Sequence, residues 1–389
     1  MALSLSQEFL LAAACAVWPS CDRRSEAIRE LAAGPVDWDR FQRVVARHRV
    51  AGLVHDGLTR AQPAVPPDIA EKIGRQAAAL VRRNLAYAAE SVRLQTLFAA
   101  AELPVLFIKG VSLAVLAYGD LGLRHSLDID LFVTPKSMAT AAILLERAGY
   151  SRTEPPAAFS EAQVQTWLLR CKDMTYVHAE KRFKVELHAR LFSNPRLMTE
   201  MPVTGSMRMV PVVNGIGLRT FSEDDLFAYL CAHGAAHCWF RLKWLADIAA
   251  LLARQPEGGI ERLYRAAHAR GAGRCAAQAM LLCQRILGTP IPHQLITSLS
   301  KDAAVRWLDA IAMKAITAER RLGTTWNSLA LFLLDSDWRY RFAELKDYST
   351  NPVDILTLPL PKKLRVLYPA LRLPLWLWRH SVHRGDSTQ

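Results

Sequence analysis

Hydrophobic and polar positions alternate with helical spacing in the first and last parts of the chain. Residues 1–60 are rich in Ala, Leu and Arg and predict several short helices, and residues 68–102 predict one long helix whose apolar side includes Leu85. In the last part of the chain a single helix is expected over 222–250, and more helices are expected to about residue 345. Both ends of the chain are therefore expected to be helical.

The middle of the chain has a different pattern, in which short apolar runs rich in β-branched and aromatic residues end at turns. Such runs are typical of buried strands. The predicted strands are 104–108, 126–133, 173–178, 183–191 and 207–213, and the predicted helices between them are 112–118 and 136–148. The pattern predicts an α+β fold, with a small mixed β-sheet core at 101–218 flanked by an N-terminal helical region at 1–100 and a C-terminal helical domain at 219–389.

The composition is that of a globular protein with an excess of positive charge. Of 389 residues, 51% are hydrophobic and 22% are charged, and the net charge of +13 suits a polyanionic partner such as a nucleotide, a nucleic acid or an anionic membrane surface. The basic residues are spread along the chain and form neither a run of five nor an RNA-binding signature, so nucleic acid is the less favoured partner.

Cysteine usage and the apolar segments predict a cytoplasmic location. The seven cysteines are an odd number with no Cys-x-x-Cys pair, which favours reduced thiols. The apolar start of the chain has no preceding basic residues and is expected to be a helix rather than a signal peptide. No transmembrane segment is expected, because no stretch reaches the roughly 18 to 20 apolar residues that span a bilayer.

Two carboxylates, Asp128 and Asp130, stand two residues apart in a predicted strand. Residues at this spacing point to the same face, about 6 to 7 Å apart, while Ile129 points to the other face. Two anions on a buried face repel each other and are costly to desolvate, so a hard cation such as Mg²⁺ is the expected compensation. A solvent-facing strand edge is the alternative explanation.

A later strand repeats this alternation, with Lys184, Glu186 and His188 on one face and Val185 and Leu187 on the other. Placed next to the first strand, Glu186 would complete a group of three carboxylates. Ordinary amphipathic alternation on a half-exposed sheet explains this strand equally well when it is considered alone.

A Lys-Gly turn precedes both strands. A strand ends at Lys109 and Gly110 and a helix then begins, so the backbone at Gly110 can approach a phosphate that the first helical amides also face. Lys109 would add a point charge and Ser112 a hydroxyl. The turn alone is a weak signal, but its combination with Asp-x-Asp and a distal Glu is much stronger.

Together these residues resemble the nucleotidyltransferase superfamily related to DNA polymerase β. That superfamily has a Gly-containing turn with a following small residue, a helix, a strand with hydrophobic-Asp-hydrophobic-Asp, and a third acidic residue on a later strand. The corresponding residues here look like Gly110 and Ser112, residues 127–130, and Glu186. The chain departs from the pattern in one respect, because Val111 separates the glycine from the small residue.

More closely, residues 70–255 are similar to a bacterial branch of that superfamily labelled uncharacterised nucleotidyltransferase. The branch has a Lys-Gly turn, a Tyr, an Arg before the Asp-x-Asp, a carboxylate-hydrophobic-His strand, and a His-x-x-x-His helix followed by Trp and Asp. The matching residues are Lys109, Gly110, Tyr118, Arg124, Glu186, Leu187, His188, His233, His237, Trp244 and Asp247.

The resemblance implies an enzyme that transfers a nucleotidyl or related phosphate-linked group from a nucleoside triphosphate such as ATP to a hydroxyl or phosphate of a small molecule or peptide. Asp128, Asp130 and Glu186 would hold two Mg²⁺ or Mn²⁺ ions, and Glu186 would also serve as general base. The residues expected to bind the nucleotide phosphates are Lys109, Gly110, Ser112 and Arg124.

The acceptor implied by the resemblance is a modified peptide, because similar proteins occur beside genes for peptide natural products such as lasso peptides. Two other functions stay open. One is a non-catalytic nucleotide-binding or peptide-binding module, against which the retention of all three carboxylates argues. The other is a tRNA-acting nucleotidyltransferase of toxin-antitoxin type, which the net charge slightly favours.

His233 and His237 stand four residues apart in the helix predicted over 222–250, and they would share a face of that helix with Arg241. A zinc-protease site is excluded, because Gly234 and Ala235 occupy the positions where a catalytic Glu is needed. These side chains are expected to line the cleft between sheet and helical domain, together with Lys184 and His188; a hydrogen-bonded core position and a structural metal site are the alternatives.

The C-terminal segment 361–380 mixes basic residues with Trp376 and Trp378 and contains several prolines, so it cannot be one regular helix. Packing against the rest of the protein is expected. A membrane surface or a peptide partner is the alternative.

Overall fold

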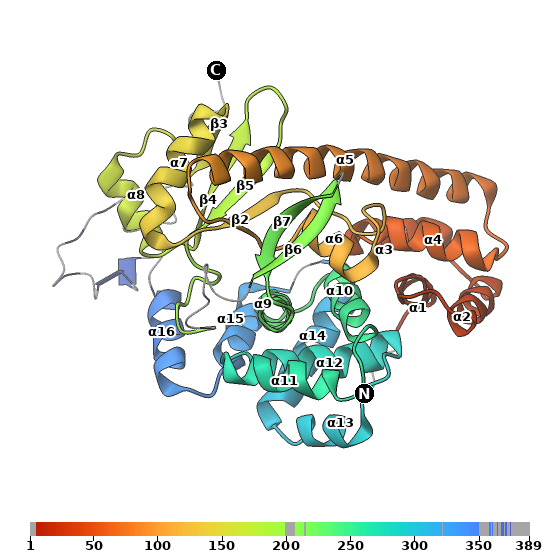
Figure 1. The fold of residues 1–389 in the computed structure, drawn as a ribbon. Coiled ribbons are helices and arrows are strands. Elements are labelled where there is room, and N and C mark those ends of the chain that lie inside the picture. Colours follow the sequence, from red (N-terminus) through yellow and green to blue (C-terminus); the bar gives the residue numbers. More distant parts are fainter. Residues whose placement is uncertain are drawn as a thin grey trace.

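The long helix α5 (Pro67–Ala100) crosses the upper part of the molecule in Figure 1, with several of the strands below it and a layer of C-terminal helices lower still. The computed structural model describes residues 5–198, 207–213, 215–320 and 322–349 and a few positions between 358 and 374. Within these residues the chain has the mixed α+β fold expected from its sequence. Most of the segment 361–380, whose packing was an expectation, lies outside the described residues.

Five strands form one mixed sheet in the order β1-β2-β5-β4-β3. β2 and β5 run parallel, and the other neighbouring pairs are antiparallel. Leu131 of β2 and Leu187 of β5 are fully buried on the covered face. β6 and β7 form a separate antiparallel hairpin. The strands are β1 (Leu106–Phe107), β2 (Ile129–Phe132), β3 (Tyr150–Glu154), β4 (Asp173–His178), β5 (Lys184–His188), β6 (Met207–Val213) and β7 (Ile216–Phe221).

Helices precede, flank and follow the sheet. Those before α5 are α1 (Gln7–Cys15), α2 (Asp22–Ala33), α3 (Trp38–His48) and α4 (Ala51–Ala61). Those between the strands are α6 (Val111–Tyr118), the 3-10 turn η1 (Pro135–Ser137), α7 (Met138–Arg147) and α8 (Glu161–Leu168). The later helices are α9 (Glu223–Ala236), α10 (Leu242–Leu252), α11 (Gly259–Ala269), α12 (Gly273–Leu287), α13 (His293–Leu299), α14 (Ala303–Thr317), α15 (Thr324–Leu333) and α16 (Trp338–Ser349).

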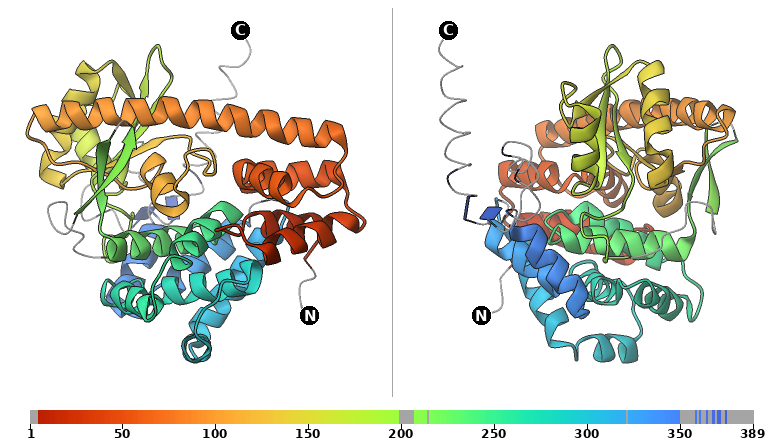
Figure 2. Two further views of the ribbon diagram at one scale, coloured as in Figure 1. Left: turned by 45° about the vertical axis from the view of Figure 1, so that its right-hand side comes forward. Right: turned by 90° about the vertical axis from the view of Figure 1, so that its left-hand side faces the viewer.

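Two hydrophobic clusters hold these elements together. One lies at the sheet and includes Leu145 of α7. The other joins the two ends of the chain, with Phe9 of α1 and Leu245 of α10 in one cluster. The N-terminal helices and the later helices, far apart in sequence, lie side by side in both views of Figure 2. His48 of α3 ties them further, because its Nδ1 accepts a hydrogen bond of 3.0 Å from the amide of Leu242.

The long helix α5 fixes the loop that leads into β2. Asn84 is buried, and its amide donates to the backbone carbonyl of Arg124 at 2.7 Å. Tyr87 donates to the carbonyl of Leu127 at 2.7 Å. The apolar pattern placed Leu85 on the core side of the helix. This prediction is wrong, because Leu85 is 52% exposed. The helix turns polar residues inward at this point because the loop carbonyls need donors.

Several predicted boundaries are wrong, and two of them bear on the site. The helix expected over 222–250 is divided into α9 and α10, because the backbone reverses at Cys238 and Trp239, whose φ angles are +50° and +51°. The strand of the Asp-x-Asp motif begins at Ile129, so Asp128 precedes it. In addition, the sequence pattern did not predict β3, β7 or α8.

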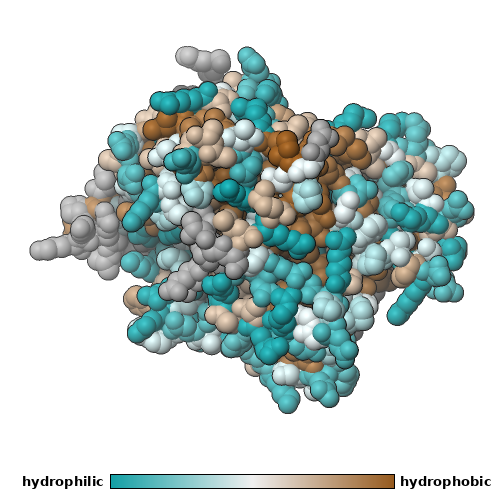
Figure 3. All heavy atoms as spheres, in the orientation of Figure 1, coloured by the Kyte–Doolittle hydropathy of each residue, from teal (hydrophilic) through white to brown (hydrophobic). Residues whose placement is uncertain are grey.

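Apolar side chains remain exposed on the β6–β7 hairpin and on the part of α5 nearby. They include Val81, Leu85, Met207, Met209 and Ile216. Figure 3 shows apolar surface over this region of the molecule. Among the described residues, no helix combines the length and the apolar character needed to cross a membrane.

The contact between α4 and the loop before β2 leads to a stability prediction. A Cβ at Gly52 would collide with the backbone carbonyl oxygen of Gly122 and with Leu123, neither of which can rotate away. We expect Gly52→Ala to lower the free energy of unfolding by about 1 to 3 kcal/mol through overpacking. The measurement is equilibrium unfolding in urea.

Gly74→Ala on α5 is the matched control, since its Cβ would make only an ordinary contact with His55. Replacing a glycine inside a helix by alanine is expected to raise stability by about 0.5 to 1 kcal/mol. Equal effects of the two substitutions would contradict the proposed close approach.

Candidate active site

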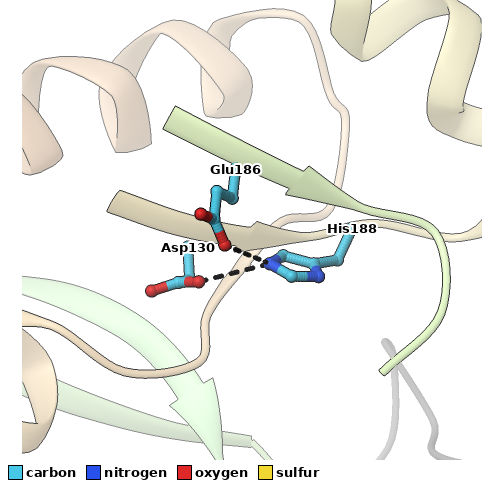
Figure 4. A group of neighbouring side chains, drawn as sticks. All are labelled: Asp130, Glu186 and His188. Carbon is cyan, nitrogen blue, oxygen red and sulfur yellow. Dashed lines mark hydrogen bonds and ion pairs between the residues drawn. The ribbon is translucent and has the colours of Figure 1, made fainter. Parts of the chain in front are cut away.

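The parallel pairing of β2 with β5 brings the acidic residues together. Asp130 lies directly opposite Glu186 in the register of the two strands, and His188 follows two residues further along β5. Among the described residues, one group of three side chains could hold a metal ion: ligand atoms of Asp130, Glu186 and His188 all lie within 4.8 Å of one another. Figure 4 shows these three side chains converging from the two strands.

Asp128 lies just outside the strand in which it was predicted. It is half-buried just before β2, and its carboxylate is not part of the group of three ligand atoms. Its charge still reaches the site, because it is among the carboxylates that raise the pKa of Lys109. The sequence predicted a group of Asp128, Asp130 and Glu186; the structure brings His188 into the place of the first of these.

Lys109 reaches the centre of the group from the turn after β1. Its Nζ lies 2.9 Å from Asp130 Oδ1, and the side chains are 14% and 0% exposed. Burial acts to lower the pKa of Lys109, but Asp130 and, with smaller effects, Asp128 and Glu186 hold this pKa well above its usual value. Lys109 is therefore charged and neutralises part of the acidic group. Lys184 does the same for Glu186, with its Nζ 2.7 Å from Oε1.

His188 is fully buried, and both of its ring nitrogens face carboxylates. Nε2 lies 3.2 Å from Asp130 Oδ1 and 3.7 Å from Glu186 Oε2, and Nδ1 lies 3.6 Å from Asp173 Oδ2. Burial, followed by the charge of Lys172, lowers the pKa of His188 to about 3. The imidazole is therefore neutral at physiological pH, which is the form that binds metal ions.

The donor set fits a divalent cation. Asp130 Oδ2 and His188 Nδ1 are buried without a hydrogen-bond partner. A buried carboxylate oxygen without a partner is costly, and a cation removes that cost. Two carboxylates and one neutral imidazole are ligands that divalent metals accept.

The turn after β1 needs glycine. Gly110 has φ +79° and ψ −132°, a conformation that residues with a side chain rarely adopt. It is the N-cap of α6, whose first-turn amides have no acceptor within the helix. Ser112 is buried, and its hydroxyl lies 3.1 Å from the carbonyl oxygens of Phe107 and of Lys109, to which it donates. Ser112 therefore stabilises the turn through hydrogen bonds to its backbone carbonyls.

Arg124 is not at the surface of the site. Its side chain is 4% exposed and its Nε lies 3.1 Å from both oxygens of Asp247, which is 1% exposed. Its Nη1 donates to the carbonyl of Gly110 at 3.3 Å. Tyr118 donates to the same carboxylate of Asp247 at 3.0 Å. The guanidinium thus connects α10 to the glycine turn.

The histidine pair lies beside a cavity rather than on one continuous helix face. His233 belongs to α9, whereas His237 caps its C-terminus and stacks on Trp244 at a ring distance of 5.4 Å. Arg241 is the N-cap residue of α10, and its guanidinium carbon lies 5.0 Å from the ring centre of Phe240. Both histidines line the cavity, and their contact with a substrate stays a prediction.

The cavity has a volume of about 730 Å³. The segment after β5, α9, α15 and α16 form its walls, and most of the wall is apolar. Lys172 lines it and lies 3.4 Å from Asp173, the residue behind His188, so the cavity adjoins the acidic group. Its lining includes Lys172, Leu191, Phe192, Leu197, His233, His237, Asn327, Ser328, Leu331, Phe332, Glu344 and Asp347.

Sequence reasoning missed two residues of the site. Asp173 lies opposite His188 in the β4–β5 pairing, and counting residues back across the predicted turn between those strands would have found it. Tyr229 of α9 is fully buried, and its hydroxyl lacks a hydrogen-bond partner. Burial and the nearby carboxylates raise the pKa of Tyr229. No sequence signal places Tyr229 here, because tertiary packing of α9 brings it near Lys109 and Asp130.

One comparison with known proteins gives a match. A family model described as uncharacterised nucleotidyltransferase matches residues 34–288. Neither a curated protein nor a solved structure matches the chain.

The buried contact between Arg124 and Asp247 leads to a second stability prediction. Asp247→Asn keeps the shape of the side chain but leaves the Arg124 charge buried without a counter-ion. We expect a loss of about 3 to 5 kcal/mol of unfolding free energy in urea denaturation.

Tyr118→Phe serves as the control, because it removes only the hydrogen bond to Asp247 and is expected to cost about 1 kcal/mol. If Asp247→Asn were no more destabilising than Tyr118→Phe, the charge pair would not be the important contact.

Proposed function

The chain belongs to the uncharacterised nucleotidyltransferase family, and we propose from this premise that it transfers a nucleotidyl group from a nucleoside triphosphate to a hydroxyl or phosphate of a small molecule or peptide. The observation that carries the proposal is the group of Asp130, Glu186 and His188 beside the Lys109–Gly110 turn. Acidic ligands next to a glycine turn at a helix N-terminus provide for a metal ion and for phosphates in one place.

The reaction joins an acceptor oxygen to the α-phosphorus of the triphosphate and breaks the bond to pyrophosphate. A divalent cation in the acidic group supplies charge neutralisation and lowers the pKa of a bound hydroxyl. Asp130 and Glu186 are its proposed ligands, with Asp128 as a further carboxylate beside them. Glu186 is also the proposed acceptor of the hydroxyl proton, since its side chain is 17% exposed and can meet an incoming acceptor.

The glycine turn is the proposed phosphate subsite. Lys109 and the first amides of α6 supply positive charge, and Gly110 gives the backbone its close approach. Arg124 has a positioning role in this proposal, because its guanidinium holds the carbonyl of Gly110 instead of pointing outward. Positioning and charge neutralisation are the main contributions to such a transfer.

The cavity next to Lys172 is the proposed acceptor subsite. Its apolar wall suits the body of a peptide or an apolar small molecule, and its lining residue Lys172 pairs with Asp173 behind His188. Glu344 and Asp347 line another part of it, and burial raises the pKa of both. Donor groups on the acceptor, such as peptide amides, would add to the contacts that these carboxyls make with Asn194 and Arg170.

The proposed chemistry predicts loss of pyrophosphate release in Asp130→Asn and in Glu186→Gln. We expect each to reduce the rate by at least about 100-fold, because ligands that act on the transferred phosphate contribute several kcal/mol. Pyrophosphate release with each nucleoside triphosphate, and the mass of the product, are measured with peptide and small-molecule acceptors.

Asp68→Asn, a mostly exposed carboxylate on α5, is the control and should keep full activity. Full transfer by Asp130→Asn would refute the proposed site. Metal-dependent triphosphate binding without transfer to any acceptor would favour a binding module over an enzyme.

The proposed acceptor subsite predicts that a substitution in the cavity changes KM for one substrate and not for the other. Ser328→Trp would fill part of the cavity from α15, so we expect KM for the acceptor to rise about tenfold or more, the effect of losing roughly 1.4 kcal/mol of binding, with KM for the triphosphate unchanged. Thr324→Trp, exposed at the start of the same helix and absent from the cavity lining, is the control. An equal change in both KM values would place the acceptor elsewhere.

A further inference from the structure

The imidazole of His188 has a carboxylate against each of its two nitrogens. Asp130 and Glu186 face Nε2, at 3.2 Å and 3.7 Å, and Asp173 faces Nδ1 at 3.6 Å. The ring is fully buried, so water does not separate it from these groups. Figure 4 shows the Nε2 edge turned toward Asp130 and Glu186.

This arrangement is unfavourable for a neutral ring on its own. A neutral imidazole has one N–H and one lone pair, so in either tautomer a lone pair faces a carboxylate. A cation bound between Nε2 and the acidic residues removes the conflict, because Nδ1–H then faces Asp173 while the Nε2 lone pair faces the cation. A carboxylate behind the second nitrogen is the usual partner of a metal-binding histidine.

An independent observation points to the same ligand. Asp130 Oδ2 is buried and has no hydrogen-bond partner, although Lys109 and His188 both contact the other oxygen. The distances from Nε2 to the two carboxylates are also close to the roughly 3 to 4 Å that separates neighbouring ligand atoms around a metal ion with bonds near 2.1 to 2.3 Å.

We propose that His188 is a nitrogen ligand of the metal ion, oriented by Asp173, and that it makes this centre bind Mn²⁺ and later first-row metals in preference to Mg²⁺. Imidazole suits transition metals, whereas Mg²⁺ prefers oxygen ligands and retains water. The inference deepens the proposed function, on which it rests for the presence of a metal centre, and replaces an all-carboxylate set by a mixed one.

The direct test uses the wild-type protein with Mn²⁺ alone, in a buffer without nitrogen and without nucleotide. Pulsed electron paramagnetic resonance detects nitrogen bound to Mn²⁺. We expect a ¹⁴N coupling that is replaced by a ¹⁵N coupling when the protein is labelled with ¹⁵N-histidine. Bound Mn²⁺ without any nitrogen coupling would overturn the proposal.

Variants identify which histidine is bound. In His188→Gln the nitrogen coupling should disappear and the Mn²⁺ dissociation constant should rise about tenfold or more, while Mg²⁺ binding changes little. His233→Gln is the matched control. His233 lies on α9 near enough to Lys109 for that charge to lower its pKa, but it is not a proposed ligand. This variant should keep both the nitrogen coupling and the Mn²⁺ affinity. A coupling that survived in His188→Gln would refute the assignment.

Asp173→Asn tests the orienting carboxylate without touching a ligand. Its side chain is 24% exposed, so folding is less at risk than for the buried His188, and circular dichroism verifies the fold of both variants. We expect a Mn²⁺ affinity about 10- to 100-fold weaker, as for other partners of metal-binding histidines. Unchanged affinity in Asp173→Asn would remove Asp173 from the proposal.

The two proposals fail separately. Nitrogen-bound Mn²⁺ without transfer to any acceptor would refute the proposed function and keep the metal assignment. Transfer supported by Mg²⁺ with no nitrogen coupling would keep the function and refute the assignment.

Discussion

The buried ion pair between Arg124 and Asp247 is the contact on which the geometry of the site depends. Asp247 lies on α10, and Arg124 lies in the loop that enters β2, so the pair fixes the later helices to the sheet. The same guanidinium holds the carbonyl of Gly110. A charge pair this deeply buried is expensive to desolvate and contributes little net stability, so its value lies in fixing one relative position of loop, turn and helix.

Two short stretches of chain connect the Arg124–Asp247 pair to the acidic group. Lys109 precedes Gly110 and forms an ion pair with Asp130, and the loop that carries Arg124 continues into β2. The backbone amide of Ile108 also donates to the carbonyl of Asp130 at 3.2 Å. Displacement of the turn would therefore move Lys109 and the β2 carboxylate together. Asn84 and Tyr87 of α5 limit such movement from the other side of the loop.

The sequence predicted the parts of the site that depend on local pattern. Alternation along β5 correctly placed Lys184, Glu186 and His188 on one face, and the strand–turn–helix at Gly110 has the expected form. Parts that depend on packing could not be predicted. β2 begins at Ile129, three residues later than predicted, so the strand alternation does not extend to Asp128. The break between α9 and α10 depends on Cys238 and Trp239, two left-handed residues that are not glycines.

The difference between local pattern and long-range packing also explains why the sequence did not predict the positions of Arg124 and Tyr229. An arginine near an Asp-x-Asp motif suggests a phosphate ligand when only the sequence is considered, and its partner Asp247 lies more than a hundred residues further along the chain. Tyr229 comes near Lys109 and Asp130 through the packing of α9, in which its ring contacts Phe221 of β7. Long-range partners decide whether a charged side chain faces a ligand or the core, and a single sequence contains no record of them.

Each of three carboxylates at the centre has its own lysine. Lys109 pairs with Asp130 at 2.9 Å, Lys184 with Glu186 at 2.7 Å and Lys172 with Asp173 at 3.4 Å. These contacts lower the negative charge that a cation would meet, and they also place positive charge beside the proposed phosphate subsite. A metal ion bound by Asp130 and Glu186 would compete with Lys109 and Lys184 for these carboxylates, and the two ammonium groups would then be available to a triphosphate. Metal binding and nucleotide binding should therefore strengthen each other at this site, because each supplies the counter-charge that the other displaces.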